Sequence, residues 1–167
     1  MLDGAAKIQT YIDRVKELAQ PAAAITDHGN LYGALEFYNI AKKNGVKPII
    51  GYEAYITTES RFERPDRDKN KRFHLTLLAE NNEGYWNLVS LASKAFTDGY
   101  YYKPRLDYEL LREHSKGVIA LSGCLGGEIA QHLAPDGSVE EGNNQGERSY
   151  QKALDKAVLY QNIFGEE

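Results

Sequence analysis

The chain has 167 residues, enough for one domain with a sizeable core, and its 42% hydrophobic and 26% charged residues are ordinary for a soluble protein. A net charge of −4 argues against a module that clamps nucleic acid by itself, because phosphate binding normally needs a basic face. It does not exclude DNA contact by other parts of a larger protein. The single cysteine, Cys124, excludes an internal disulfide, and no apolar stretch approaches membrane-spanning length. With no signal-peptide pattern at its start, we expect a cytoplasmic protein that does not enter a membrane.

Helices and strands are predicted to alternate along the chain. The hydrophobic spacing predicts, in chain order, helix 5–19, strand 22–26, helix 30–43, strand 47–56, strand 73–79, helix 81–96, helix 108–113, strand 117–121, helix 128–133 and helix 150–164. Pro21 ends the first helix, and Asn44-Gly45 ends the second. This alternation is typical of α/β proteins, and we expect the strands to be parallel.

Two segments are predicted to be surface loops. Residues 57–72 carry six basic and four acidic side chains, which is typical of a solvated loop, and residues 135–147 are polar and rich in glycine. An aromatic segment, 99–105, bridges the middle of the chain. No domain boundary is evident, so we treat 1–167 as one domain.

Side chains with metal-binding chemistry stand at or near the ends of the predicted strands. They are Asp27, His28, Glu53, His74 and Cys124. Functional groups gather at strand ends in α/β folds, and carboxylate, imidazole and thiolate groups are the side chains that bind zinc and similar ions. A carboxylate inside an apolar strand, as at Glu53, is costly without a partner. The pattern is compatible with a metal site, but the signal is weak, because separations of tens of residues give no short-range metal motif.

Each of these side chains also has a purely structural explanation. Asp27 could cap the helix that follows it, His28 could bond to backbone, and Glu53 could pair with a lysine. His74 could lie on an outer face, and Cys124 could be a small buried hydrophobe. Taken singly the structural explanation is preferred, whereas the coincidence of all five at strand ends favours the metal site. The residues alone leave both alternatives open.

Six stretches, taken together and in this order, resemble the polymerase-and-histidinol-phosphatase (PHP) domain found at the N-terminus of bacterial DNA polymerase III alpha subunits. They are LDGAAKI, PAAAITDHGNLYGALEFY, GVKPIIGYEAYI, FHLTLLAENNEGYWNLV, GYYYKPRLDYELL and ALSGCLGGEIAQ. The likeness covers nearly the whole chain and is weakest at 57–72 and 135–150. The combination is specific, because standalone PHP phosphoesterases share the Asp-His pair but not YYKPRLD or SGCLGGEI.

The resemblance implies an α/β fold of the TIM-like type, a distorted (β/α)7 barrel with zinc or manganese at one mouth. By matching position, the metal ligands would be Asp3, His28, Glu53, His74 and Cys124. Asp27 would be a neighbour that orients or caps rather than a ligand. Metal ions in such a centre would activate water and stabilise the transition state of phosphodiester hydrolysis.

The sequence also departs from the PHP pattern. The expected His-x-His strand before LDGAAKI and a later Asp-x-His pair are both absent, so we expect an incomplete barrel, a partial domain and weak or no metal binding by these 167 residues. His74 opens its strand, which would place it at the wrong end of a parallel sheet. We therefore expect the 57–72 loop to carry the chain back so that His74 still approaches Glu53.

Three functions follow from the resemblance. The leading hypothesis is a fragment of a replicative DNA polymerase whose synthesis, with magnesium, resides in other regions, and whose PHP domain has 3′–5′ exonuclease or phosphoesterase activity; the fragment alone would be inactive. Its partners would be the rest of the polymerase chain, a proofreading exonuclease, the sliding clamp and, through the whole polymerase, DNA. The alternatives are a standalone metal-dependent phosphoesterase and a non-catalytic scaffold that docks a proofreading subunit.

Overall fold

The computed structural model describes residues 6–66, 70–133 and 149–165. Asp3 and the predicted loop 135–147 lie outside the described residues. The elements are, in chain order, α1 (Ile8–Glu17), β1 (Ala22–His28), α2 (Ala34–Lys43), β2 (Lys47–Ile56), β3 (Phe73–Ala79), α3 (Asn82–Thr97), β4 (Arg105–Leu106), α4 (Tyr108–Glu113), β5 (Val118–Leu121), α5 (Glu128–Leu133) and α6 (Tyr150–Phe164). Every predicted helix and strand is present, whereas the two-residue β4 was not predicted.

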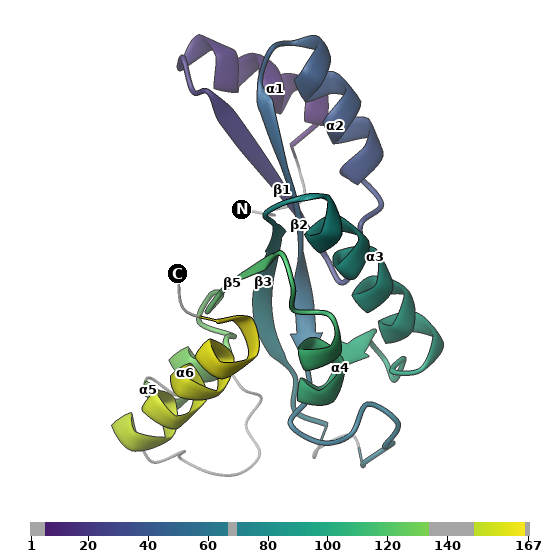
Figure 1. Ribbon diagram of the computed structural model, residues 1–167, viewed down its shortest axis with the longest axis vertical. Helices are drawn as coiled ribbons and strands as arrows, with labels where there is room; N and C mark the ends of the chain where they lie inside the picture. The colour runs from purple at the N-terminus through teal and green to yellow at the C-terminus, as the bar shows by residue number, and fades with distance from the viewer. Residues whose placement is uncertain (1–5, 67–69, 134–148, 166–167) are drawn as a thin grey trace.

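The strands form one mixed sheet in the order β1-β2-β3-β5, and β4 pairs with β2 beyond the end of β1 (Figure 1). β2 runs parallel to β1 and β4, but β3 is antiparallel to both β2 and β5. The prediction of parallel strands is therefore wrong for β3. A parallel neighbour needs a crossover connection, usually a helix, and the segment between β2 and β3 contains no helix in its described part.

Helices cover one face of the sheet. α1 and α2 pack on this face of β1 and β2 through one hydrophobic cluster, and α3, α4 and α6 pack on the same face of β2 and β3 through a second. In the strands this face carries Tyr52, Ala54, Leu75 and Leu77, which are almost completely buried. Strand side chains alternate between faces, so the neighbouring residues Glu53 and His74 point to the other side. No helix in the described part of the chain is long and apolar enough to span a membrane.

The expected α/β class is confirmed, but a closed barrel is not seen. Over the described residues the sheet is open, with β5 at one edge and β1 and β4 at the other. A barrel would require these two edges to be joined through further strands. The expectation of seven strands therefore stays a prediction.

Three helices begin at a polar residue whose side chain caps the first turn. Asn81 accepts a hydrogen bond from the Gly84 backbone N–H at the start of α3. Asp107 does the same for Leu110 in α4. Ser149 caps α6 through the Lys152 backbone N–H.

Part of the predicted 57–72 loop is anchored rather than solvated, which corrects the sequence-based expectation for this segment. Arg61 is only 7% exposed, and its guanidinium group donates to both oxygens of Asp107 at 2.9 and 3.1 Å. Arg105 is fully buried and donates to the backbone carbonyls of Gly99, Arg61 and Glu63. The mixed charge of the segment predicted exposure to solvent. The buried partners of the loop, Arg105 and Asp107, are 44 and 46 residues away from Arg61 in the sequence, so the sequence did not indicate them.

Replacing Asp107 with alanine should lower the free energy of unfolding by roughly 3–5 kcal/mol, because the buried Arg61 charge loses its partner and α4 loses its cap. The matched control is Glu109→Ala, since Glu109 also contacts Arg61, at 3.4 Å, but its side chain is 72% exposed. That change should cost less than about 1 kcal/mol. Urea unfolding followed by circular dichroism measures both, and equal losses would contradict the assigned role of the buried pair.

Candidate metal centre

The uncovered face of the sheet brings three of the predicted metal ligands together. His28 at the end of β1 is the register partner of Glu53 in β2, so both side chains lie on one face. In β3, His74 is the register partner of Tyr55, which lies two residues beyond Glu53 on the same face. The antiparallel turn of the chain thus places His74 diagonally opposite Glu53, although His74 opens its strand.

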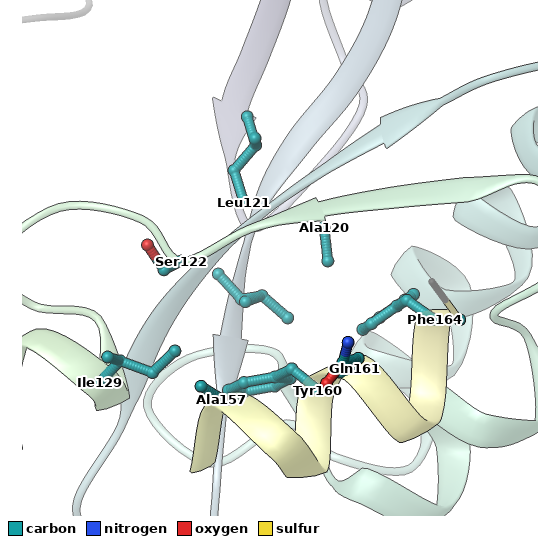
Figure 2. Close-up of a pocket in the computed structure, with 10 residues that line it drawn as sticks. Ala120, Leu121, Ser122, Ile129, Ala157, Tyr160, Gln161 and Phe164 are labelled. Atoms are coloured by element: carbon teal, nitrogen blue, oxygen red, sulfur yellow. The ribbon is translucent and has the colours of Figure 1, made fainter. Parts of the chain in front are cut away.

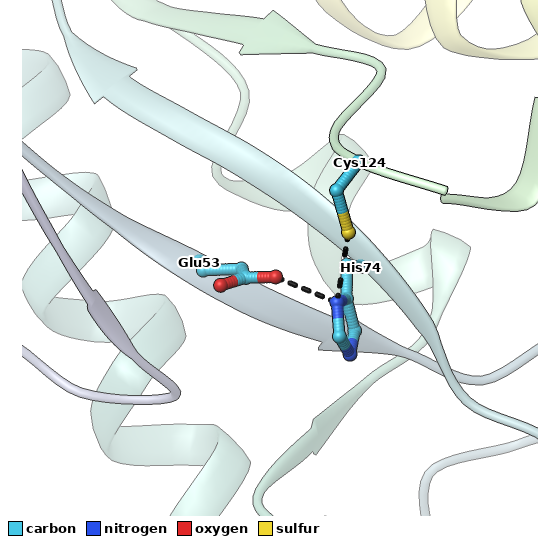
Figure 3. Close-up of side chains that lie close together, drawn as sticks. All are labelled: Glu53, His74 and Cys124. Carbon is cyan, nitrogen blue, oxygen red and sulfur yellow. Dashed lines mark hydrogen bonds and ion pairs between the residues drawn. The ribbon is translucent and has the colours of Figure 1, made fainter. Parts of the chain in front are cut away.

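The Glu53 carboxylate joins the two histidines. One of its oxygens lies 2.6 Å from Nδ1 of His74, and the other lies 3.0 Å from Nε2 of His28. Figure 3 shows Glu53 and Cys124 both directed at His74, with the Cys124 Sγ 3.4 Å from the same Nδ1. The expected approach of His74 to Glu53 is therefore present. The Glu53 side chain is 16% exposed and His74 is 36% exposed, so the cluster opens to solvent on one side.

Cys124 reaches the cluster from the loop between β5 and α5. Its thiol accepts a hydrogen bond from the Gly126 backbone N–H, and the Gly126 carbonyl accepts one from the His74 N–H at 2.9 Å. A Cβ at Gly126 would come within 3.1 Å of the His74 ring. The glycine therefore permits the loop to lie directly on the imidazole, which explains the Gly-rich sequence around Cys124.

A tight turn follows His28 and holds it at the mouth of the cluster. Gly29 has φ +70°, and its N–H donates to the Glu53 carbonyl at 2.8 Å, which extends the β1–β2 pairing by one residue. A Cβ there would lie 2.7 Å from the ring of Tyr55. Both the backbone conformation and the space require glycine at this position.

Asp27 points to the opposite face from His28, as strand alternation requires. Its carboxylate accepts a hydrogen bond from the backbone N–H of Gly33 at 2.8 Å, just before α2 begins. The structure thus gives Asp27 a role at the start of the helix. A contribution to the metal centre through the intervening turn stays a prediction.

The donor set fits a metal ion of the zinc type. Glu53, His74 and Cys124 each offer one ligand atom, and these atoms lie within 4.8 Å of one another. A nitrogen and a sulfur ligand of tetrahedral zinc lie about 3.5 Å apart, close to the 3.4 Å between His74 and Cys124. The 2.6 Å between His74 and Glu53 is a hydrogen-bond distance. That contact must lengthen by somewhat less than 1 Å if both groups are to bind one ion.

Comparison with known proteins decides the family, because the model of the PHP domain matches residues 1–167. The chain belongs to the PHP domain family. Three curated relatives, each named DNA polymerase III subunit alpha, show how far the likeness extends. The Thermus aquaticus protein is 59% identical over 81% of this chain, the Helicobacter pylori J99 protein 47% over 98%, and the Chlamydia muridarum protein 44% over all of it.

The PHP chain spans only about one eighth of the length of these relatives, since it covers 12%, 13% and 12% of them. Among solved structures, one described as a metal-dependent phosphoesterase from Bifidobacterium adolescentis covers 56% of this chain and is itself covered over 29% of its length. Its sequence identity of 17% and TM-score of 0.39 are too low to support any conclusion about the PHP chain.

A buried carboxylate at the start of α5 was not predicted from the sequence. Glu128 is 2% exposed and accepts hydrogen bonds from the hydroxyl groups of Tyr108 and Tyr160, and Lys156 lies 2.7 Å from one of its oxygens. Burial and then Glu128 itself raise the pKa of both phenols, which therefore remain donors at neutral pH. Because Glu128 directly follows the Cys124 loop, this network fixes one end of that loop to α4 and α6.

The groove between β5 and α6 is a separate feature on the covered side of the sheet (Figure 2). It has a volume of about 240 Å³ and is lined largely by apolar side chains such as Leu75, Ala120 and Ile129. Among the described residues, none of the predicted metal ligands lines it. The groove is therefore distinct from the candidate metal centre on the opposite face.

Replacing Glu128 with glutamine should lower the free energy of unfolding by about 3 kcal/mol, because Lys156 then keeps a partly buried charge without its carboxylate. The control Glu113→Gln alters an exposed residue at the end of α4 and should change stability by less than about 0.5 kcal/mol. Chemical denaturation of both variants measures the difference. If Glu128→Gln is as stable as the control, the network does not hold the Cys124 loop.

Proposed function

We propose that this PHP chain is part of a DNA polymerase III alpha subunit and that its centre holds zinc or manganese. Identities of 44–59% to proteins of that name support the first part. The convergence of Glu53, His74 and Cys124 on one side of the sheet is the observation that carries the second part. Template-directed DNA synthesis with magnesium would then reside in regions of the polymerase outside these residues.

The reaction proposed for the centre is phosphodiester hydrolysis, as a 3′–5′ exonuclease or a phosphoesterase. Bound metal would supply an activated water molecule and would neutralise charge on the phosphate. His74 and Cys124 would hold the metal, and the two oxygens of Glu53 would reach both the metal and His28. His28, whose side chain is 51% exposed, would contact metal or substrate from the solvent side.

Asp3 is proposed as a further ligand solely on the match of its motif, since it lies outside the described residues. The proposed barrel of seven strands would be closed by segments beyond β1 and β5. The proposed partners are the remainder of the polymerase chain, a proofreading exonuclease, the sliding clamp and, through the whole polymerase, DNA. The proposed compartment is the cytoplasm.

Two alternative functions make different demands on the same residues. A standalone phosphoesterase needs the metal centre but no polymerase regions, and the sequence of the gene on both sides of this segment would reveal palm carboxylates or a stop codon. A scaffold that docks a proofreading subunit needs no metal. The carboxylate, imidazole and thiol donors gathered at one point favour a metal-dependent function over the scaffold.

Metal analysis of the full-length polypeptide, meaning the whole proposed polymerase chain rather than residues 1–167 alone, tests the proposal. After dialysis the wild type should retain stoichiometric zinc or manganese, whereas His74→Ala and His28→Ala should lower the metal affinity by at least about tenfold. His132→Ala is the matched control, because His132 lies in the last turn of α5 and is not a member of the cluster, so its replacement should leave metal content unchanged. Substitution with cobalt adds a second readout, since ligation by Cys124 gives a sulfur-to-cobalt absorption that Cys124→Ser removes.

Wild-type polypeptide without stoichiometric metal would refute the metal centre and favour the scaffold. The isolated segment 1–167 should bind metal weakly or not at all if further ligands lie elsewhere in the polypeptide. Tight zinc retention by that segment would instead show that the described ligands suffice.

A further inference from the structure

A short turn outside the predicted ligand set reaches the mouth of the candidate centre. It consists of residues 99–104 and leads directly into β4. We infer that this turn binds the substrate of the centre, with Lys103 contacting a phosphate group and Tyr102 stacking on the nucleoside base that carries it. The inference rests on the proposed phosphodiester hydrolysis and names residues that hold its substrate.

Strand pairing places the turn beside the centre. Along one edge of β2, β1 pairs as far as Glu53 and β4 pairs from Tyr55 onward, so the end of β1 and the start of β4 meet. At this junction Pro104 packs on Gly29, which directly follows His28: a Cβ at Gly29 would lie 3.0 Å from the proline ring. Lys103 directly precedes Pro104 and is therefore adjacent in the chain to the residue that contacts the turn after His28.

Aromatic contacts carry the connection from Lys103 to the cluster. The Lys103 Nζ lies 5.4 Å from the centre of the Tyr55 ring, and that ring meets the His74 ring edge-on at a centroid distance of 5.4 Å. Tyr55, at 8% exposure, is covered on this side by the turn. The Tyr55 ring thus contacts both the Lys103 ammonium group and the His74 imidazole.

The charge of Lys103 is available to a ligand. In the part of the chain that the structure describes, no carboxylate lies within 4.0 Å of its Nζ, and the side chain is exposed. An ammonium group carries three donors and binds phosphate as a point charge. Attraction to the Tyr55 ring holds the ammonium group over that ring without neutralising its charge.

The turn is rigidly held although its tip is exposed. Arg105 anchors its base through three backbone carbonyls, and the Tyr101 hydroxyl donates to the Pro65 carbonyl at 2.9 Å. Between them Tyr102 has φ +59° and is 59% exposed. A non-glycine residue in the left-handed region persists only where the surroundings impose it, and such residues cluster at functional sites.

Tyr102 contributes little to packing beyond an edge-on contact with Tyr101 at 4.7 Å. Tyr102 directly precedes Lys103 in the chain, and both side chains are exposed. Such a pair can bind a nucleotide, because an aromatic ring stacks on a base while a cation holds the phosphate. A phosphate ester without a base could use Lys103 but would gain nothing from Tyr102. The pair therefore favours a nucleotide over a small phosphate ester.

Binding of thymidine 5′-monophosphate and of inorganic phosphate to the full-length, manganese-loaded polypeptide tests the inference. Lys103→Ala should weaken both ligands by about tenfold, because a charge-assisted hydrogen bond is lost, and Lys103→Arg should retain most of the affinity. Tyr102→Ala should weaken only the nucleotide, by about fivefold or more. The control is Lys43→Ala, an exposed lysine at the far end of α2. Titration calorimetry gives the affinities, and metal content is measured on every variant.

Unchanged nucleotide binding by Lys103→Ala, or an equal loss in Lys43→Ala, overturns the inference. It is also overturned if the wild type binds neither ligand, or if it holds no metal. Should the wild type bind the nucleotide through Lys103 but hydrolyse no phosphodiester, the inference stands and the proposed hydrolysis fails. If Lys103→Ala binds the nucleotide and hydrolyses phosphodiesters as the wild type does, the inference fails and the proposed hydrolysis stands.

Discussion

The antiparallel pairing of β2 with β3 is the constraint on which the candidate centre depends. Side chains alternate along each strand, so the register that buries Leu75 and Leu77 in the core also sends His74 to the face that carries Glu53. A shift of one residue would bury the imidazole and expose the leucines, and the hydrophobic core therefore fixes the position of the polar pair. Stability and site geometry are consequences of one register.

Two buried charges hold the loops that flank this face. Arg105 fastens the 99–104 turn on one side, and Glu128 fastens the Cys124 loop on the other. Burial of a charge is unfavourable unless its hydrogen-bonding capacity is met, so each network has a strong preference for a single arrangement. The exposed tips of the loops can therefore be held in place without being packed themselves.

The sequence predicted the helices, the long strands and the side chains of the cluster, because these depend on local periodicity and on residue chemistry. It did not predict the direction of β3, which depends on the length and content of a connection rather than on the strand itself. Nor did it assign Arg61 or Glu128, whose partners Asp107 and Tyr160 lie 46 and 32 residues away. Mixed charge looks the same in a solvated loop and in a buried ion pair until the fold supplies the partner.

The contacts of Glu53 show why the ligand residues cannot be understood alone. Its two oxygens serve two histidines from two different strands, so the carboxylate stabilises the alignment of β1, β2 and β3 even without a metal ion. The same contacts keep the donors close enough to be shared by one ion, and the short distance between Glu53 and His74 means that an ion must displace a hydrogen bond to bind. The metal affinity of this centre would then depend on the difference in free energy between the metal-bound cluster and the metal-free, hydrogen-bonded cluster. The rigid loops on both sides would set that difference by limiting how far the donors can move apart.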